Sequence, residues 1–171
     1  VREAAQRGAA AVAISPVHAM FSDDLHRFSP YGPSSRVLFN ALHIDPSAGW
    51  FPHYVGHADE CGRGGGVGAN RNVPLAPETP DVGWVDALAE IVDDIRVFDP
   101  GAVVVSLGVD AAADDPESPL RVTADGYRAG GALIGALGVP TVAVQEGGYH
   151  LPTLGDLVRA TIEGLEAGGG L

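Results

Sequence analysis

Cysteine, basic residues and long apolar runs are scarce in this chain, and each scarcity excludes a class of protein. The single Cys61 excludes an internal disulfide and a zinc site built from several cysteines, which suits a reducing compartment. Ten basic residues face 22 acidic ones, and the net charge of -12 opposes binding to nucleic-acid phosphates and anionic membranes. No apolar run is long enough to cross a bilayer, and no secretory signal pattern is present. We therefore expect a cytoplasmic protein without a nucleic-acid or membrane partner.

Hydrophobic runs of strand length indicate the fold class. The runs at 102–110 and 140–149 are rich in valine and end on residues whose side chains can take part in catalysis or ligand binding, Asp110 and Tyr149. Shorter runs at 9–14 and 37–42 have a similar character. Such runs without alternation are typical of strands buried on both faces of a parallel sheet. Because ligands bind beyond the carboxyl ends of parallel strands, we expect Asp110 and Tyr149 to face a common crevice.

Helical spacing occurs between these runs. Apolar residues from Trp84 to Ile95 recur three or four positions apart, which predicts an amphipathic helix that ends before Pro100. Thr123 is placed to cap a helix that runs to about residue 137, and a closing helix is expected over 154–165. Residues 46–80 show little periodicity and are expected to form an extended loop, which the sequence leaves open as either well ordered or disordered. The pattern as a whole predicts an α/β fold.

Several motifs in a fixed order carry a resemblance to a known family. They are GWFPHYVGHADE at 49–60, the glycine-rich run 62–72 followed by Val-Pro-Leu, the strand end 105–110 followed by Asp-Asp-Pro at 114–116, and EGGY at 146–149. From about His43 to Glu166 the chain thereby resembles the zinc-dependent histone deacetylase superfamily. Within that superfamily it looks most similar to the acetylpolyamine amidohydrolases.

The resemblance implies a fold and a set of roles. The fold is the α/β arginase-deacetylase architecture, a parallel sheet with flanking helices, of which this chain would be an incomplete carboxyl-terminal part. Asp110 is implied to be a zinc ligand, and Tyr149 the phenol that hydrogen-bonds the substrate carbonyl as it becomes an oxyanion. Gly148, with Gly147 before it, permits the tight turn that brings the phenol to the substrate, and Phe51 lines the substrate channel. The implied substrates are acetylated polyamines or acyl-lysine, and the implied cofactor is zinc.

Each of the two main site residues also has a purely structural interpretation. An aspartate at a strand end can cap a following turn or helix, and a tyrosine can pack in the core with its hydroxyl on a backbone carbonyl. The motifs that flank Asp110 and Tyr149 favour the functional roles.

The histidines depart from the family pattern. The family uses an adjacent His-His pair for proton transfer and an Asp-x-His-His-Gly segment for its other two zinc ligands, and neither is present in this sequence. In the family the pair would lie upstream of Val1. Asp24 and His26 have the Asp-x-His spacing, and they stand with His18 as candidate substitute ligands, so zinc retention is left open. We expect the truncated chain to be inactive alone.

A second resemblance covers residues from about Val12 to Asn40. Its runs are SPVHAMF at 15–21 and FSPYGPSSR at 28–36. They are similar to the amino-terminal barrel region of 4-alpha-glucanotransferases of the amylomaltase type, whose catalytic carboxylates have no counterpart here. This interpretation makes the chain a mosaic, with an amylomaltase-like segment at 1–42 and a deacetylase-like part at 43–171, in one compact unit.

Three functions remain as alternatives at this point. The first is a zinc-dependent deacetylase, inactive as the truncated chain. The second is a non-catalytic α/β module or pseudoenzyme fragment, and the third is an α-glucan-binding or glucan-transferring fragment. A truncated sheet also leaves an exposed edge strand and an uncovered apolar face, which predicts self-association.

Overall fold

A computed structural model describes residues 9–13, 37–51, 53–62 and 67–169, with the backbone alone for 9–13. Its elements in chain order are β1 (Ala9–Ala13), β2 (Val37–Ile44), the short 3-10 helix η2 (Pro46–Ala48), β3 (Asn70–Leu75), α3 (Asp81–Phe98), β4 (Val103–Leu107), α4 (Ala124–Gly135), β5 (Thr141–Gln145) and α5 (Leu151–Gly168). Within these ranges, no helix combines the length and the apolar character that a membrane span needs.

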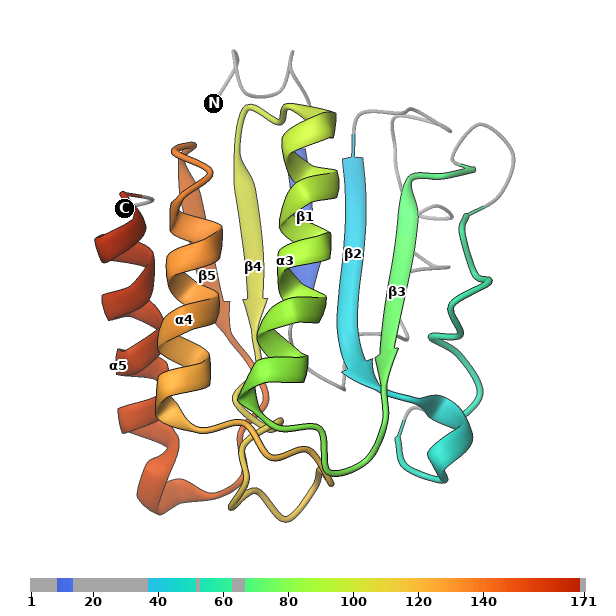
Figure 1. The fold of residues 1–171 in the computed structure, drawn as a ribbon, viewed down its shortest axis with the longest axis vertical. Coiled ribbons are helices and arrows are strands. Elements are labelled where there is room, and N and C mark those ends of the chain that lie inside the picture. Colours follow the sequence, from blue (N-terminus) through green and yellow to red (C-terminus); the bar gives the residue numbers. More distant parts are fainter. Residues whose placement is uncertain (1–8, 14–36, 52, 63–66, 170–171) are drawn as a thin grey trace.

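The strands form one parallel sheet in the order β3-β2-β1-β4-β5 (Figure 1). β1 comes first in the chain and lies at the centre, between β2 and β4. The predicted α/β class is confirmed, and the predicted strands occur within a few residues of their expected bounds. The boundary expected near residue 42 falls inside β2. Residues 14–36 lie outside the described part, so the mosaic interpretation stays a prediction.

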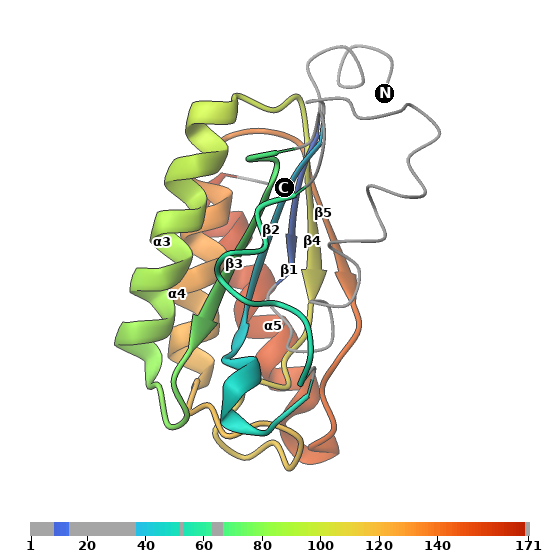
Figure 2. The ribbon, with the colours of Figure 1, turned by 90° about the vertical axis from the view of Figure 1, so that its right-hand side faces the viewer.

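The helices α3 and α4 lie on one side of the sheet (Figure 2). On α3, the apolar stripe that the spacing predicted is buried, as expected. The indole of Trp84 packs on the ring of Tyr127 from α4, with the ring centroids 5.4 Å apart. Burying apolar area in this layer stabilises the fold by roughly 25 cal/mol per Å². The buried residues of the stripe are Trp84, Leu88, Ile91, Val92 and Ile95.

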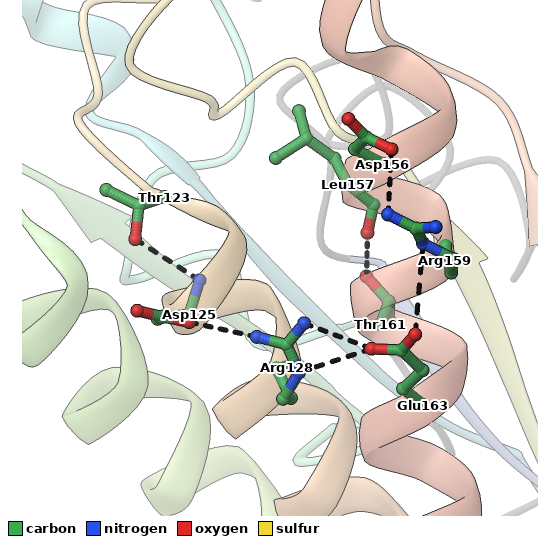
Figure 3. Close-up of polar contacts among 8 residues, drawn as sticks. All are labelled: Thr123, Asp125, Arg128, Asp156, Leu157, Arg159, Thr161 and Glu163. Carbon is green, nitrogen blue, oxygen red and sulfur yellow. Dashed lines mark hydrogen bonds and ion pairs between the residues drawn. The ribbon is translucent and has the colours of Figure 1, made fainter.

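Glycines bring α4 and α5 into backbone contact. A Cβ atom placed on Gly164 would overlap the carbonyl oxygen of Arg128 on the neighbouring helix. At the rim of this contact, the Arg128 guanidinium donates to Glu163 of α5 at 3.0 Å (Figure 3). Thr123 caps α4 as predicted, because its hydroxyl accepts a hydrogen bond from the Asp125 amide at 3.3 Å. The two helices therefore form a close pair beside the sheet.

The other face of the sheet carries no helix among the described residues. Val104 of β4 is exposed there, in register with Val142 of β5, which is 59% exposed. Val144 continues the same stripe. The prediction that these strands are buried on both faces is therefore wrong for β4 and β5, because helices cover one side alone in the described ranges. The predicted uncovered apolar face is confirmed for this part of the chain.

Residues 46–80 are not the continuous loop that the sequence predicted. They contain η2 and the strand β3, which pairs with β2 at the edge of the described sheet. The side-chain amide of Asn70 donates to the Glu60 carbonyl, and that of Asn72 donates to the His57 carbonyl at 3.1 Å. These polar side chains interrupt the apolar pattern of a strand, and their partners lie on the loop that precedes β3. Pro74 is tolerated because β3 is an edge strand.

Candidate active site

Asp110 lies at the carboxyl edge of the sheet, directly after β4. The pairing of β4 with β5 continues past both strands, because the Glu146 amide donates to Leu107 and the Val109 amide donates to Gly147, each at 2.9 Å. The next residue, Asp110, is 1% exposed. A carboxylate this deeply buried is costly without polar or charged partners. Asp110 is therefore an interior group held against the β5 side of the edge.

Gly147 and Gly148 carry the chain past Asp110 at short range. A Cβ atom on Gly147 would lie 2.5 Å from Oδ2 of Asp110 and 2.7 Å from its Cγ. Gly148 has φ 135°, and a Cβ atom there would meet the side chains of Val109 and Leu154 at 2.6 and 2.7 Å. Both positions therefore require glycine, the first for close approach and the second also for its backbone conformation. The sequence analysis expected a tight turn here, and what the structure shows is this close approach of the backbone to Asp110.

Tyr149 follows this turn and is 50% exposed, so it is not a packed core tyrosine. Partial burial raises the pKa of its phenol, and the negative charges of Asp110, Asp115 and Glu117 raise it further. A tyrosine hydroxyl is protonated at neutral pH even with its ordinary pKa, so with this rise it remains a group that can donate a hydrogen bond. The structure thus brings together a buried carboxylate and an accessible phenol.

Asp115 links the two loops that carry these groups, and the sequence analysis gave it no role. Its Oδ2 accepts hydrogen bonds from the amides of Tyr149, at 2.7 Å, and His150, at 3.2 Å. Its Oδ1 accepts from the amide of Glu117 at 2.9 Å. The one sequence signal was its place in the Asp-Asp-Pro run after a strand end, which does not identify partners more than 30 residues away.

The loop after β4 also has contacts on its solvent-exposed side and on its buried side. Arg121 binds both carboxylate oxygens of Glu78, at 2.8 and 3.1 Å, and donates to the Ala113 carbonyl at 3.1 Å. On the inner side, Tyr127 is fully buried. Burial raises the pKa of Tyr127 well above its usual range, and the charge of Asp110 adds to the rise. The buried side of the site is therefore formed in part by the uncharged ring of Tyr127.

Phe51 lies on a different loop of the same sheet edge. It follows η2, after the strand β2, and β1 separates β2 from β4 in the sheet. The Phe51 ring packs edge-on against His53, with centroids 6.3 Å apart, and both the Phe51 side chain and the neighbouring Tyr54 are exposed. The structure thus gives an aromatic group at the expected edge, but it does not bring Phe51 into contact with Asp110 or Tyr149.

His43 near the end of β2 is fully buried, and the sequence analysis gave it no role. Its Nδ1 donates to the Ile44 carbonyl at 2.7 Å, while Nε2 is buried without a hydrogen-bond partner. Burial lowers the pKa of the imidazole, an effect that the hydrogen bond to the Ile44 carbonyl partly opposes. We conclude that His43 is a neutral interior group on the face of the sheet opposite α3.

The described residues do not complete a zinc site. No group of three histidine, cysteine, aspartate or glutamate side chains that could hold a metal occurs among them. Zinc takes three or four protein ligands in most sites, and Asp110 alone supplies one. The candidate substitutes His18, Asp24 and His26 lie outside the part of the chain that the structure describes.

Comparisons with known proteins agree on one family. The histone deacetylase domain model matches residues 17–165, which includes part of the segment compared above with amylomaltases. Acetylpolyamine amidohydrolase of Mycoplana ramosa is 41% identical over 75% of this chain and 38% of its own length. Acetylpolyamine amidohydrolase 2 of Pseudomonas aeruginosa is 36% identical over 94% of this chain and 46% of its own length.

The fold comparison gives the same result. The crystal structure of acetylpolyamine aminohydrolase from Burkholderia pseudomallei superposes with a TM-score of 0.83 at 34% identity. The match covers 95% of this chain and 46% of that one. The expected deacetylase-type α/β fold is thus confirmed in part of its length, and the chain spans less than half of the relatives it matches.

Proposed function

Because the chain belongs to the histone deacetylase family, we propose that it is the carboxyl-terminal catalytic part of a deacetylase acting on acetylated polyamines or acyl-lysine. One observation carries the proposal: Gly147 is packed against the buried carboxylate of Asp110, two residues before the exposed phenol of Tyr149. An acidic group and a hydrogen-bond donor thereby lie close together at one edge of the sheet, which supports a hydrolytic site there.

In this proposal Tyr149 stabilises the charge that develops on the carbonyl oxygen. Its phenol is protonated at neutral pH, as that of any tyrosine with an ordinary or raised pKa is, and its half-exposed position leaves the hydroxyl accessible to an amide. A donor held in place before reaction stabilises an oxyanion without reorganisation. Phe51, on the loop that follows β2 at the same edge, offers an apolar surface to the methylene chain of the amine.

Asp110 is the contribution of this chain to a zinc site whose other ligands would come from outside the described residues. Zinc, when bound, would polarise the amide carbonyl and lower the pKa of a water molecule. The family's adjacent His-His pair, which would move protons, is absent from the sequence. We therefore infer that the chain is inactive alone.

The test is an assay of deacetylation with and without a complementing chain. Acetylated polyamine would be supplied to the purified chain, alone and mixed with the amino-terminal half of an acetylpolyamine amidohydrolase. We expect release of acetate only in the mixture and not with the purified chain by itself. Mixtures made with Asp110→Asn or Tyr149→Phe should release no acetate. The matched control Asp114→Asn removes a charge from an exposed neighbour and should keep the activity.

The outcomes separate the proposal from its rivals. Chelator-sensitive deacetylation by the chain alone would overturn the inferred inactivity but support the site. Activity that survives Tyr149→Phe and Asp110→Asn would overturn the site. If no mixture of folded proteins deacetylates the substrate, the non-catalytic module would be favoured.

A further inference from the structure

We propose that Asp115 is a positioning residue, which fixes the main chain of Tyr149 relative to Asp110 so that the phenol is held where a substrate carbonyl would lie. The proposal rests on the deacetylase function proposed above. Asp115 touches no reacting atom, because its contacts are with backbone amides.

The carboxylate of Asp115 is buried and fully used. Oδ2 accepts from the amides of Tyr149 and His150 at 2.7 and 3.2 Å, and Oδ1 accepts from the amide of Glu117 at 2.9 Å. Hydrogen bonds to a carboxylate are shorter and stronger than those between neutral groups. A single side chain therefore holds three amides from two loops.

These bonds continue the connection between the loops where the strand pairing ends. The β4–β5 pairing extends as far as Gly147, whose carbonyl accepts from Val109. Tyr149 is the second residue beyond that point, and 34 positions separate it from Asp115 in the sequence. The bond to Asp115 thus joins the loop that carries Asp110 to the loop that carries Tyr149.

The phenol depends on this backbone link because its side chain is weakly packed. Tyr149 is half exposed, so fewer packing contacts hold its side chain than would hold a buried one. Gly148, which precedes Tyr149, has φ 135°, a conformation that few other residues adopt. The helix α5 begins two residues after Tyr149. With the direction of the side chain set mainly by the main chain, a small shift of the turn moves the hydroxyl. Misplacement by about 1 Å can lower a rate by roughly a hundredfold.

A simple helix cap is the competing role for Asp115. His150 is the N-cap of α5, and its side chain makes no capping bond, so Asp115 also supplies an acceptor near that terminus. A cap alone would affect stability, and the folded fraction of a variant would keep its kcat. The positioning role predicts a change in kcat that depends on the phenol itself.

The first experiment measures amide hydrogen exchange by NMR in the chain as it exists. In Asp115→Asn we expect the amides of Tyr149 and His150 to exchange at least roughly tenfold faster, with the core of α3 unchanged. Asp114→Asn is the matched control, because it removes the neighbouring charge from an exposed side chain. Unchanged exchange at Tyr149 in Asp115→Asn would overturn the proposal.

The second experiment measures kcat and KM in the complemented, active mixture for Asp115→Asn, Tyr149→Phe and the double variant. We expect Asp115→Asn to lower kcat about 10- to 100-fold with KM within about twofold, and to add little once the phenol is absent. Effects that multiply fully would show that Asp115 acts independently of Tyr149, and the proposal would be wrong. Far-ultraviolet circular dichroism verifies folding, and Asp115→Glu, which keeps the charge, replaces a variant that does not fold.

The two experiments fail in different ways. If no mixture deacetylates, the proposed function fails, while the exchange rates still decide whether Asp115 holds the Tyr149 turn. If the mixture is active and Asp115→Asn keeps the kcat of the parent chain, the deacetylase proposal stands and the positioning role is rejected.

Discussion

Replacing Gly164 by alanine should separate α4 from α5 and destabilise the fold. The new Cβ atom would overlap the Arg128 carbonyl oxygen and lie 2.9 Å from the Ala132 nitrogen, where ordinary contact begins at 3.4 Å. Both obstacles are backbone atoms, which cannot rotate away as a side chain can. Overpacking of this kind costs about 1–3 kcal/mol, and a rigid backbone obstacle places the cost at the upper end.

In a helix interior, alanine is more favourable than glycine by about 1 kcal/mol, and this gain in helix propensity opposes the steric cost. The net effect of Gly164→Ala should therefore be a loss of about 2 kcal/mol, or roughly 4–8 °C in Tm for a domain of this size. Gly155→Ala is the matched control on the same helix, because its Cβ atom would meet nothing within 4 Å. That variant should gain about 0.5–1 kcal/mol.

The assay is urea unfolding followed by circular dichroism at one protein concentration. The two variants should move the unfolding midpoint in opposite directions, and their difference should reach about 3 kcal/mol. Equal stability of Gly164→Ala and Gly155→Ala would refute the argument that backbone contact between the helices requires glycine.

Three further predictions concern the site and the sheet. Gly147→Ala should cost about 1–3 kcal/mol in urea unfolding, because its Cβ atom would lie 2.5 Å from Oδ2 of Asp110. Burial lowers the pKa of His43 from 6.5, so the unfolded chain takes up the proton first and stability falls as pH drops below 6.5; His43→Gln should flatten that slope in urea titrations at pH 7.5 and 5.5. The chain should self-associate through the exposed valines of β4 and β5, so Val142→Lys should lower the mass measured by sedimentation, while Val97→Lys on α3 should not. A monomeric parent chain, or an unchanged pH slope, would contradict the corresponding prediction.

Local sequence patterns predicted the elements in which the spacing of apolar residues itself determines which residues are buried. The spacing from Trp84 to Ile95 placed α3, because one helical face is buried along its whole length. The valine runs placed β4 and β5, and Thr123 placed the start of α4. In each case the determining contacts lie within the element or along a continuous apolar stripe.

Features set by distant partners could not be predicted in this way. β3 is stabilised as an edge strand although Asn70 and Asn72 are polar, because carbonyl groups 10 and 15 residues earlier, on the loop that precedes the strand, accept their hydrogen bonds. Asp115 acquires its partners from a turn beyond β5. The open face of the sheet was expected from its truncation, but the composition of Val104 and Val142 does not reveal it, because such runs also suit strands buried on both faces.

The sheet order has a consequence for how the chain folds. β1 leads the sequence, yet it separates the β2–β3 pair from the β4–β5 pair, and its register with β4 matches Ala10 to Val103. The two halves can join only after a contact of long sequence separation has formed, and such high contact order slows folding. Until β4 has been synthesised and docked, one edge of β1 stays open to other chains. Shortening the alanine-rich strand β1 should therefore separate the β2–β3 pair from the β4–β5 pair, whereas shortening an edge strand would only narrow the sheet.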